Sequence, residues 1–150
     1  MLLPRVRVAA LIPRENAILL ALHEKDGRRV WVLPGGGVDP GESMVDALKR
    51  ELLEELGLAI VPKAIVHACE AIDPQGSRHL IQLSFLCECR ADDHPRATGI
   101  DPRVVDAHFV SCEDIPRLDI HPPIQTDLAL LMQQGFPHRL PLPANRWVNS

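Results

Sequence analysis

The chain has 150 residues, of which 46% are hydrophobic, and a net charge of −4. This length and apolar content allow one globular domain with a real core and leave little room for a second. The acidic balance argues against binding to long nucleic acid, which favours a basic surface, although an acidic chain can bind a small phosphate ester through a divalent cation.

Three strands are predicted before the first strong break in regular structure. Residues 6–12 are apolar and β-branched, and residues 17–22 resume this pattern after a short interruption, so the two predict a hairpin. Residues 29–33, which include Trp31, predict a third strand. The run Pro34-Gly35-Gly36-Gly37 is expected to stop regular structure and to open a long loop.

A helix is predicted over Met44 to Leu56, where the chain has neither proline nor glycine. Ser43 is a suitable N-cap, and Asp46 stands three residues later, where a capping-box acid would be. Gly57 follows the last helical residue, as glycine commonly does at a helix C-terminus. The helix is therefore bounded at both ends by local signals.

The second half of the chain predicts further strands and a weaker helix. In order, we expect extended segments at 58–61 and 65–72, a turn at 73–76, a strand at 79–89, an exposed loop at 91–101, a strand at 104–110, a short helical or turn segment at 112–118, and a last helix from Pro122 or Pro123 to about Gln134. The sum is an α/β domain in which helices cover a sheet. We assign residues 1–136 to this domain and residues 137–150, with three prolines, to a tail.

Three glutamates of the first predicted helix fall on one side of it. At about 100° per residue, Glu51, Glu54 and Glu55 share an arc. The neighbouring arc is apolar and consists of Val45, Leu48, Leu52 and Leu56. Like charges at i and i+4 repel, and a divalent cation with oxygen ligands would relieve that repulsion.

The glycines ahead of the helix suit the same chemistry. Gly35, Gly36 and Gly37 let the backbone approach a ligand closely, and their carbonyls can join a metal site. The nearby helix N-terminus offers free N–H groups to a phosphate. Taken separately, an acidic helix face is usually a solvated surface and glycines before a helix are usually a turn. Seven fixed identities at fixed spacing, however, arise by chance with a frequency on the order of 10⁻⁸ per position.

The segment from Gly36 to Leu58 resembles the Nudix box of the MutT-type hydrolase superfamily. That motif is Gly, five residues, Glu, seven residues, Arg-Glu, an apolar residue, any residue, Glu-Glu, any residue, Gly and an apolar residue. The sequence GGVDPGESMVDALKRELLEELGL matches every specified position without a gap. The resemblance implies an α/β/α sandwich with a mixed β-sheet, in which the box forms a loop–helix–loop.

The resemblance also implies roles for individual residues. Glu51, Glu54 and Glu55 would bind Mg²⁺ or Mn²⁺ with a carbonyl of Gly35 or Gly36, and Gly35, Gly36 and Gly37 would contact the substrate. Arg50 would orient a catalytic glutamate, and Glu42 would fix the loop or support the metal. The implied catalytic set is Glu42, Arg50, Glu51 and Glu54.

The general base is left open by the motif. It is one of the box glutamates or an acid outside the box, for which Asp101 and Asp106 are preferred over Glu113 and Asp114. Further candidates for substrate contacts are Arg5, Arg7 and Arg78 for phosphate, Trp31 for a base, and His121 in the cleft, although surface or core roles are commoner for each.

The implied activity is hydrolysis of the pyrophosphate bond in a nucleoside diphosphate linked to a moiety X, by attack of water on phosphorus. A nucleoside triphosphate pyrophosphohydrolase is the nearest alternative, and a non-catalytic nucleotide-binding module is the alternative from another class. The partner is then a small nucleotide, with no long nucleic acid and no membrane, and a homodimer is possible. The N-terminal residues lack a signal-peptide pattern, so we expect a cytoplasmic protein.

Overall fold

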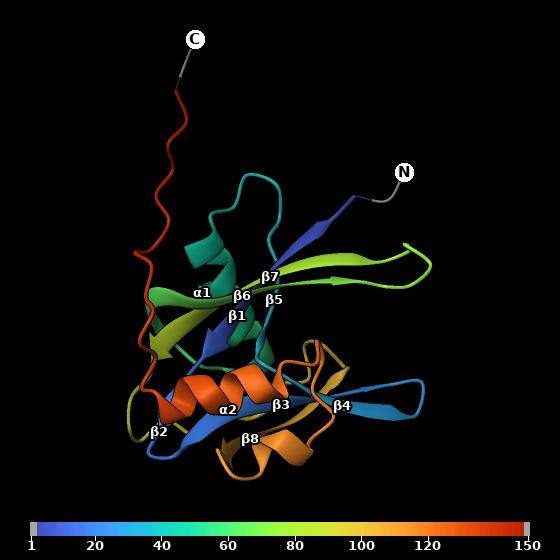
Figure 1. Ribbon diagram of the computed structural model, residues 1–150, viewed down its shortest axis with the longest axis vertical. Helices are drawn as coiled ribbons and strands as arrows, with labels where there is room; N and C mark the ends of the chain where they lie inside the picture. The colour runs from blue at the N-terminus through green and yellow to red at the C-terminus, as the bar shows by residue number, and fades with distance from the viewer. Residues whose placement is uncertain (1–2, 149–150) are drawn as a thin grey trace.

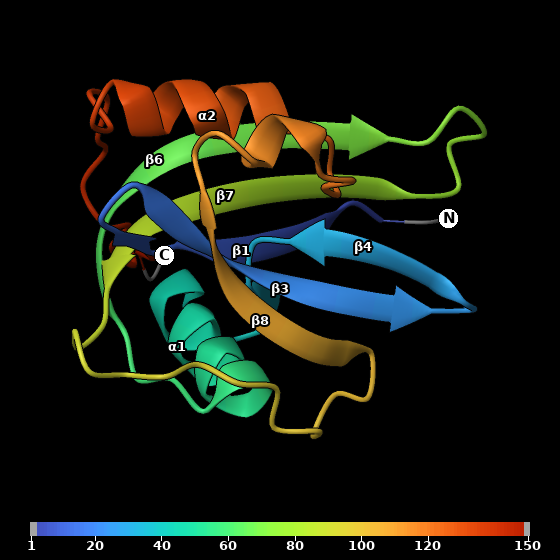
Figure 2. The same cartoon turned by 90° about the horizontal axis from the view of Figure 1, so that it is seen from below.

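The computed structural model describes residues 3–148 and shows strands sandwiched between two helices (Figures 1 and 2). Helix α1 (Met44–Leu56) covers one face of the strands and α2 (Gln125–Gln133) covers the opposite face. This confirms the predicted α/β class and the α/β/α layering.

The strands form two sheets of four strands each. The first has the order β5–β1–β7–β6, and its strands are β5 (Gly35–Gly37), β1 (Arg5–Leu11), β7 (His79–Glu88) and β6 (Val61–Ile72). It is mixed, because β1 is parallel to β7 whereas β5 and β6 run antiparallel to their neighbours. In the second sheet β3 (Ala17–Lys25) pairs with β2 (Pro13–Arg14), β4 (Arg28–Val32) and β8 (Val104–Ser111), all antiparallel.

The predicted hairpin between residues 6–12 and 17–22 is wrong in its pairing. The first of these segments is β1, which pairs with β5 and β7 in the first sheet. The hairpin partner of β3 is the two-residue strand β2, so the chain changes sheets near Ile12. Local sequence could not show this, because the parallel partner of β1 lies some seventy residues further along the chain.

Residues 8–11 of β1 and 18–21 of β3 are buried on both faces, which explains why these stretches are apolar without a break. Alternate residues of β1 belong to two separate cores: Val8 and Ala10 pack with the apolar stripe of α1, whereas Ala9 and Leu11 pack with α2. The stripe residues Leu48 and Leu52 are fully buried, so α1 is held by its apolar flank and its acidic flank is left for other contacts.

The ends of α1 follow the predicted signals. The backbone N–H of Asp46 donates to Ser43 Oγ at 3.1 Å, and Gly57 caps the C-terminus in the left-handed conformation with φ of 61°. The loop at 91–101 is mostly exposed as expected, but it also contacts this end: the Thr98 N–H donates to the carbonyl of Glu55 at 3.0 Å. The loop is thereby fixed and carries Asp101 towards the glutamates.

Other segments differ from prediction by a few residues. Instead of two extended segments at 58–61 and 65–72, the chain has one strand, β6, which begins at Val61 and has register shifts at Pro62/Ala64 and Ile65/His67; residues 58–60 lie before it and are not in a strand. The segment at 112–118 holds the short 3₁₀ helix η1 (Ile115–Arg117). No helix among residues 3–148 is long and apolar enough to cross a membrane.

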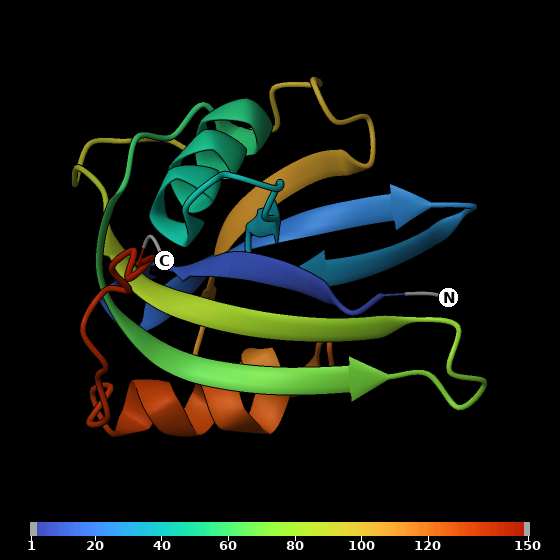
Figure 3. The same cartoon turned by 90° about the horizontal axis from the view of Figure 1, so that it is seen from above.

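The C-terminal segment starts on the domain and then leaves it. Phe136 is buried, and Leu140 exchanges two backbone hydrogen bonds with Ile65 on the outer edge of β6, at 2.9 and 3.0 Å. Beyond this bridge the chain extends away from the sheets, upwards in Figure 1 and therefore towards the viewer in Figure 3. Trp147 in this segment is 83% exposed. The division between domain and tail at residue 136 stays a prediction.

Candidate active site

A cleft of about 690 Å³ is lined by residues of both sheets. It lies towards the β3–β4 and β6–β7 hairpins, which project on the same side of the molecule in Figure 1. Its lining comes from both sheets, from α1 and from the loop before β8. All three predicted metal ligands line it, namely Glu51, Glu54 and Glu55, together with the three predicted glycines, Gly35, Gly36 and Gly37. The structure therefore brings the two halves of the motif to one cavity.

The three glutamates differ in burial. Glu55 is only 4% exposed, the side chain of Glu51 is 17% exposed, and that of Glu54 is 46% exposed. Burial raises the pKa of Glu55 to about 7, although Arg7 and a backbone hydrogen bond from Gly35 oppose the shift. Burial also raises the pKa of Glu51 against the effect of Arg50. Both pKa shifts apply to the site without metal, and both arise because these carboxylates are poorly solvated.

One oxygen of Glu55, Oε2, is buried without a hydrogen-bond partner among the described residues. A buried carboxylate oxygen without a partner costs free energy that a cation would recover. No three acidic, histidine or cysteine side chains within residues 3–148 already converge on one point. The donor set and the orphaned oxygen suit a hard divalent cation, and the more exposed Glu54 has the freedom to complete its shell.

Arg50 connects the helix to the loop that precedes it. Its guanidinium makes a two-pronged contact with Glu42, with Nε to Oε2 at 2.7 Å and Nη2 to Oε1 at 2.9 Å. Its Nη1 donates to Glu51 at 3.0 Å and to Glu54 at 3.4 Å. The bond to Arg50 is the main reason that the pKa of Glu42 falls to about 2. Arg50 thus fixes the loop and orients two glutamates at once.

The three glycines form strand β5, so the prediction that they stop regular structure is wrong. Gly35 pairs with Ala9 and Gly36 with Val8 on β1. A Cβ at Gly35 would overlap the backbone of Val8, so glycine is required there, whereas a Cβ at Gly36 would displace the carboxylate of Glu51. The close approach predicted for this segment is therefore real, but the backbone is a strand that touches the glutamates.

Comparison with known proteins agrees with this geometry. The family model of the NUDIX domain matches residues 2–132. The chain belongs to the Nudix hydrolases.

Its similarity extends to curated proteins and to solved structures. It is 31% identical to a nucleoside triphosphatase, NudI, of Escherichia fergusonii over 84% of this chain and 95% of that protein. It is 31% identical to an ADP-ribose pyrophosphatase of Methanocaldococcus jannaschii over 77% of this chain and 66% of that protein. The crystal structure of a MutT Nudix hydrolase from Burkholderia pseudomallei superposes with a TM-score of 0.70 and 30% identity, covering 87% of this chain and 98% of that one.

The two acids predicted outside the Nudix box lie in different places. Asp101 lines the cleft, but Arg103 donates to both of its carboxylate oxygens at 3.0 and 2.8 Å and lowers its pKa. Asp106 lies on β8 outside the cleft lining, bonded to the Ala107 N–H and to His108, which together lower its pKa. Both carboxylates therefore accept hydrogen bonds that favour their charged form, which makes them weaker bases.

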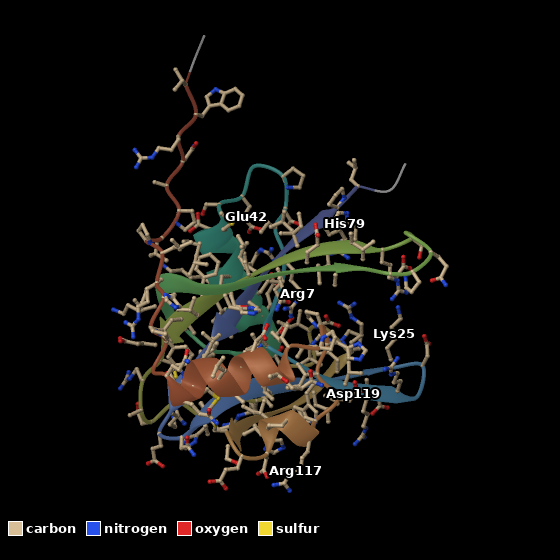
Figure 4. All side chains as sticks on the ribbon, viewed as in Figure 1. Arg7, Lys25, Glu42, His79, Arg117 and Asp119 are labelled. Carbon is tan, nitrogen blue, oxygen red and sulfur yellow. The ribbon has the colours of Figure 1, made fainter. Side chains whose placement is uncertain are left out.

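Several residues that line the Nudix cleft were named in the sequence analysis only as further candidates for substrate contacts. Arg7 is half-buried and fixed by bonds from its guanidinium to Gln82 Oε1 and to the carbonyl of Leu33, both at 2.7 Å (Figure 4). Arg5, Arg78 and His121 also line the cleft. Trp31 does not line it and instead contacts the ring of His108, with centroids 6.0 Å apart. Arg5 and Arg7 lie close to Arg78 only because β1 pairs with β7, which is distant in the sequence.

Two polar residues of the cleft were missed by sequence reasoning, His23 and Arg103. Burial and the nearby guanidinium of Arg7 lower the pKa of His23 to about 4, so its imidazole is neutral at neutral pH. Its Nε2 is buried without a partner among the described residues. The only sequence signal was the position of His23 directly after the apolar run 17–22, which is a weak indication of function.

Proposed function

We propose that this Nudix hydrolase cuts the pyrophosphate bond of a nucleoside diphosphate linked to a moiety X, with Mg²⁺ or Mn²⁺ as cofactor. The observation that carries the proposal is the set of Glu51, Glu54 and Glu55 against the glycine strand in one cleft. Ordinary surface glutamates are solvated, whereas Glu55 is buried and has an oxygen without a partner among the described residues.

In this proposal Glu51, Glu54 and Glu55 hold the metal, with a carbonyl from Gly35 or Gly36. The cation supplies Lewis-acid chemistry: it lowers the pKa of water and neutralises charge on the diphosphate. Glu54 is the best placed of the three to take the proton from the attacking water, because its side chain is the most exposed to the cleft. Asp101 and Asp106 are disfavoured as the base by their existing bonds.

Arg50 and Glu42 position these groups without touching the substrate. The two-pronged contact holds the loop against α1, and the remaining Arg50 N–H groups orient Glu51 and Glu54. Arg7, fixed on the floor of the cleft, supplies positive charge close to Glu55. The products are a nucleoside monophosphate and a phosphorylated X.

We expect the cleft to recognise the charged phosphates of the substrate more than its nucleobase. None of the described cleft residues is Phe or Trp, and the chain has no Tyr, so a stacking platform worth about 1–3 kcal/mol per base is missing from the lining. We therefore expect two or more nucleoside diphosphate derivatives to be turned over with comparable efficiency.

A second candidate is hydrolysis of nucleoside triphosphates with release of pyrophosphate. It is favoured by the similarity to the nucleoside triphosphatase NudI, which extends over 95% of that protein. The same acidic cleft serves either reaction, so the difference lies in which phosphorus the water attacks.

The test is a product assay over nucleotide sugars, ADP-ribose, dinucleoside polyphosphates and dNTPs, each with Mg²⁺, with Mn²⁺ and with excess chelator. We expect monophosphate products from diphosphate derivatives, loss of activity with chelator and recovery with added cation. Full turnover in chelator would contradict metal dependence, and exclusive use of one dNTP would favour the second candidate. Binding of nucleotides without turnover of any would identify the non-catalytic alternative.

A further inference from the structure

The catalytic cleft continues outwards into a second hollow of about 450 Å³. His23, Val30, Arg78, Arg103 and His121 line both cavities, so the two are contiguous. The outer hollow adds the β3–β4 hairpin, from which Lys25 and Arg28 contribute (Figure 4 labels Lys25 at this edge). The opening is therefore framed by side chains from separate strands, brought together by the fold.

This outer hollow is basic although the chain as a whole is acidic. Four cationic side chains line it, Lys25, Arg28, Arg78 and Arg103, against a single acid, Asp26. Arg28 and Arg103 are partly neutralised by ion pairs with Asp119 and Asp101. Lys25 and Arg78 form no ion pair with a carboxylate among residues 3–148. Two positive side chains that form no ion pair among the described residues thus lie at one concave place.

The diphosphate that is cut does not account for these cations. The inner end of the cleft carries Glu51, Glu54 and Glu55, and a divalent cation there would bind that diphosphate. The outer end needs no metal to attract an anion, because its own side chains are positive. The shared wall also contains His23, whose Nε2 lacks a hydrogen-bond partner among the described residues.

We infer that the outer hollow is a subsite for an additional phosphate, so that the preferred substrates carry at least one phosphate besides the diphosphate that is cleaved. The inference rests on the proposed function and narrows its substrate class. Lys25 and Arg78 are the specificity-determining residues, and Arg103 and His121 complete the wall. The extra phosphate is either a branch on a sugar or a continuation of a linear polyphosphate chain.

Two matched substrate pairs separate these sources. NAD⁺ and NADP⁺ share a pyrophosphate and differ by one branch phosphate, whereas diadenosine triphosphate and diadenosine pentaphosphate differ in linear chain length. The enzyme is compared with the double variant Lys25→Gln/Arg78→Gln. The control, Lys63→Gln/Arg117→Gln, makes the same change of charge at exposed positions outside both cavities.

We expect kcat/KM to favour the phosphate-rich member of at least one pair by about tenfold or more, since charge-assisted hydrogen bonds discriminate strongly. The double variant should lose that preference and the control should retain it; the pair that responds identifies the position of the phosphate. Equal kcat/KM within both pairs, or an equal loss on both members in the double variant, would overturn the inference.

Binding of inorganic tripolyphosphate without metal, measured by calorimetry, tests the subsite independently of turnover. Weakening of about tenfold in the double variant but not in the control supports the subsite even if no pyrophosphate is cut, in which case the proposed function alone fails. Equal binding by the wild type and the double variant contradicts the subsite.

Discussion

The two ends of the cleft are built in different ways. The inner, acidic end comes from one continuous segment, in which β5, the loop and α1 carry Gly36, Glu42, Arg50 and the three glutamates within one Nudix box. The outer, basic end comes from hairpins and loops that are distant in sequence, with Lys25, Arg78 and Arg103 on three separate segments. The residues proposed for the reaction therefore lie close together in the sequence, whereas the cationic residues of the outer end are brought together only by the pairing of strands. We therefore expect substitutions at the inner end to lower the rate of turnover strongly, and substitutions at the outer end to change the selectivity between substrates.

The largest expected effect is at Glu54. Glu54→Gln keeps the shape of the side chain and removes its charge, so turnover should fall by about 10²-fold or more with a parallel loss of metal affinity. The free energy of unfolding without metal should change by less than about 1 kcal/mol, because an exposed pair with Arg50 contributes little. Lys49→Gln, on the exposed side of the same helix, is the control. Retained activity in Glu54→Gln would make α1 a structural element only.

Two neighbouring glycines of β5 should respond differently to substitution by alanine: one change should lower the rate of turnover and the other the stability of the fold. Gly36→Ala places a methyl group against the movable Glu51 carboxylate and should reduce turnover by about tenfold or more, with a small change in thermal midpoint. Gly35→Ala places it against the Val8 backbone, which cannot move aside, and should destabilise the fold by about 1–3 kcal/mol. Rate and urea-unfolding measurements check the pair. Equal stability losses in the two variants would contradict the assigned contacts.

The Arg50–Glu42 contact predicts a pH-dependent contribution to stability. The pKa of Glu42 is lowered to about 2 from an ordinary 4.5, so its contribution is full above 4.5 and is lost as pH falls towards 2. Arg50→Lys cannot make the two-pronged contact and should lose most of this contribution. The difference in thermal midpoint between the wild type and the variant, without metal, should be larger at about pH 6 than at about pH 3. A difference independent of pH would show that Glu42 is not stabilised by this bond.

The smallest effect is expected from the C-terminal segment. Removal of residues 137–150 loses the two backbone bonds between Leu140 and Ile65 and should destabilise the domain by about 1–3 kcal/mol. Removal of residues 147–150 alone should leave the stability of a monomer unchanged, because Trp147 is exposed. We retain the prediction of a homodimer, for which light scattering of both truncations is the test. A monodisperse full-length monomer would contradict it.

The sequence predicted the inner end of the cleft better than the outer one for a physical reason. Helix α1 is delimited by Ser43 and Gly57, and its spacing alone places three carboxylates on one flank. The pairing of β1 with β7 joins residues far apart in the chain, and no local pattern shows that it brings Arg7 to Gln82. His23 and Arg103 were missed because each is an isolated polar residue whose neighbours are set by strand pairing.

The central claim is that water attacks phosphorus at the acidic end of the cleft. Hydrolysis of a nucleoside diphosphate derivative in ¹⁸O-labelled water, followed by mass spectrometry of both products, tests it most directly. If water attacks phosphorus, one labelled oxygen is expected on a phosphate and none on the sugar carbon of X. Label on the sugar carbon would mean transfer of a glycosyl group to water and would contradict the assigned reaction.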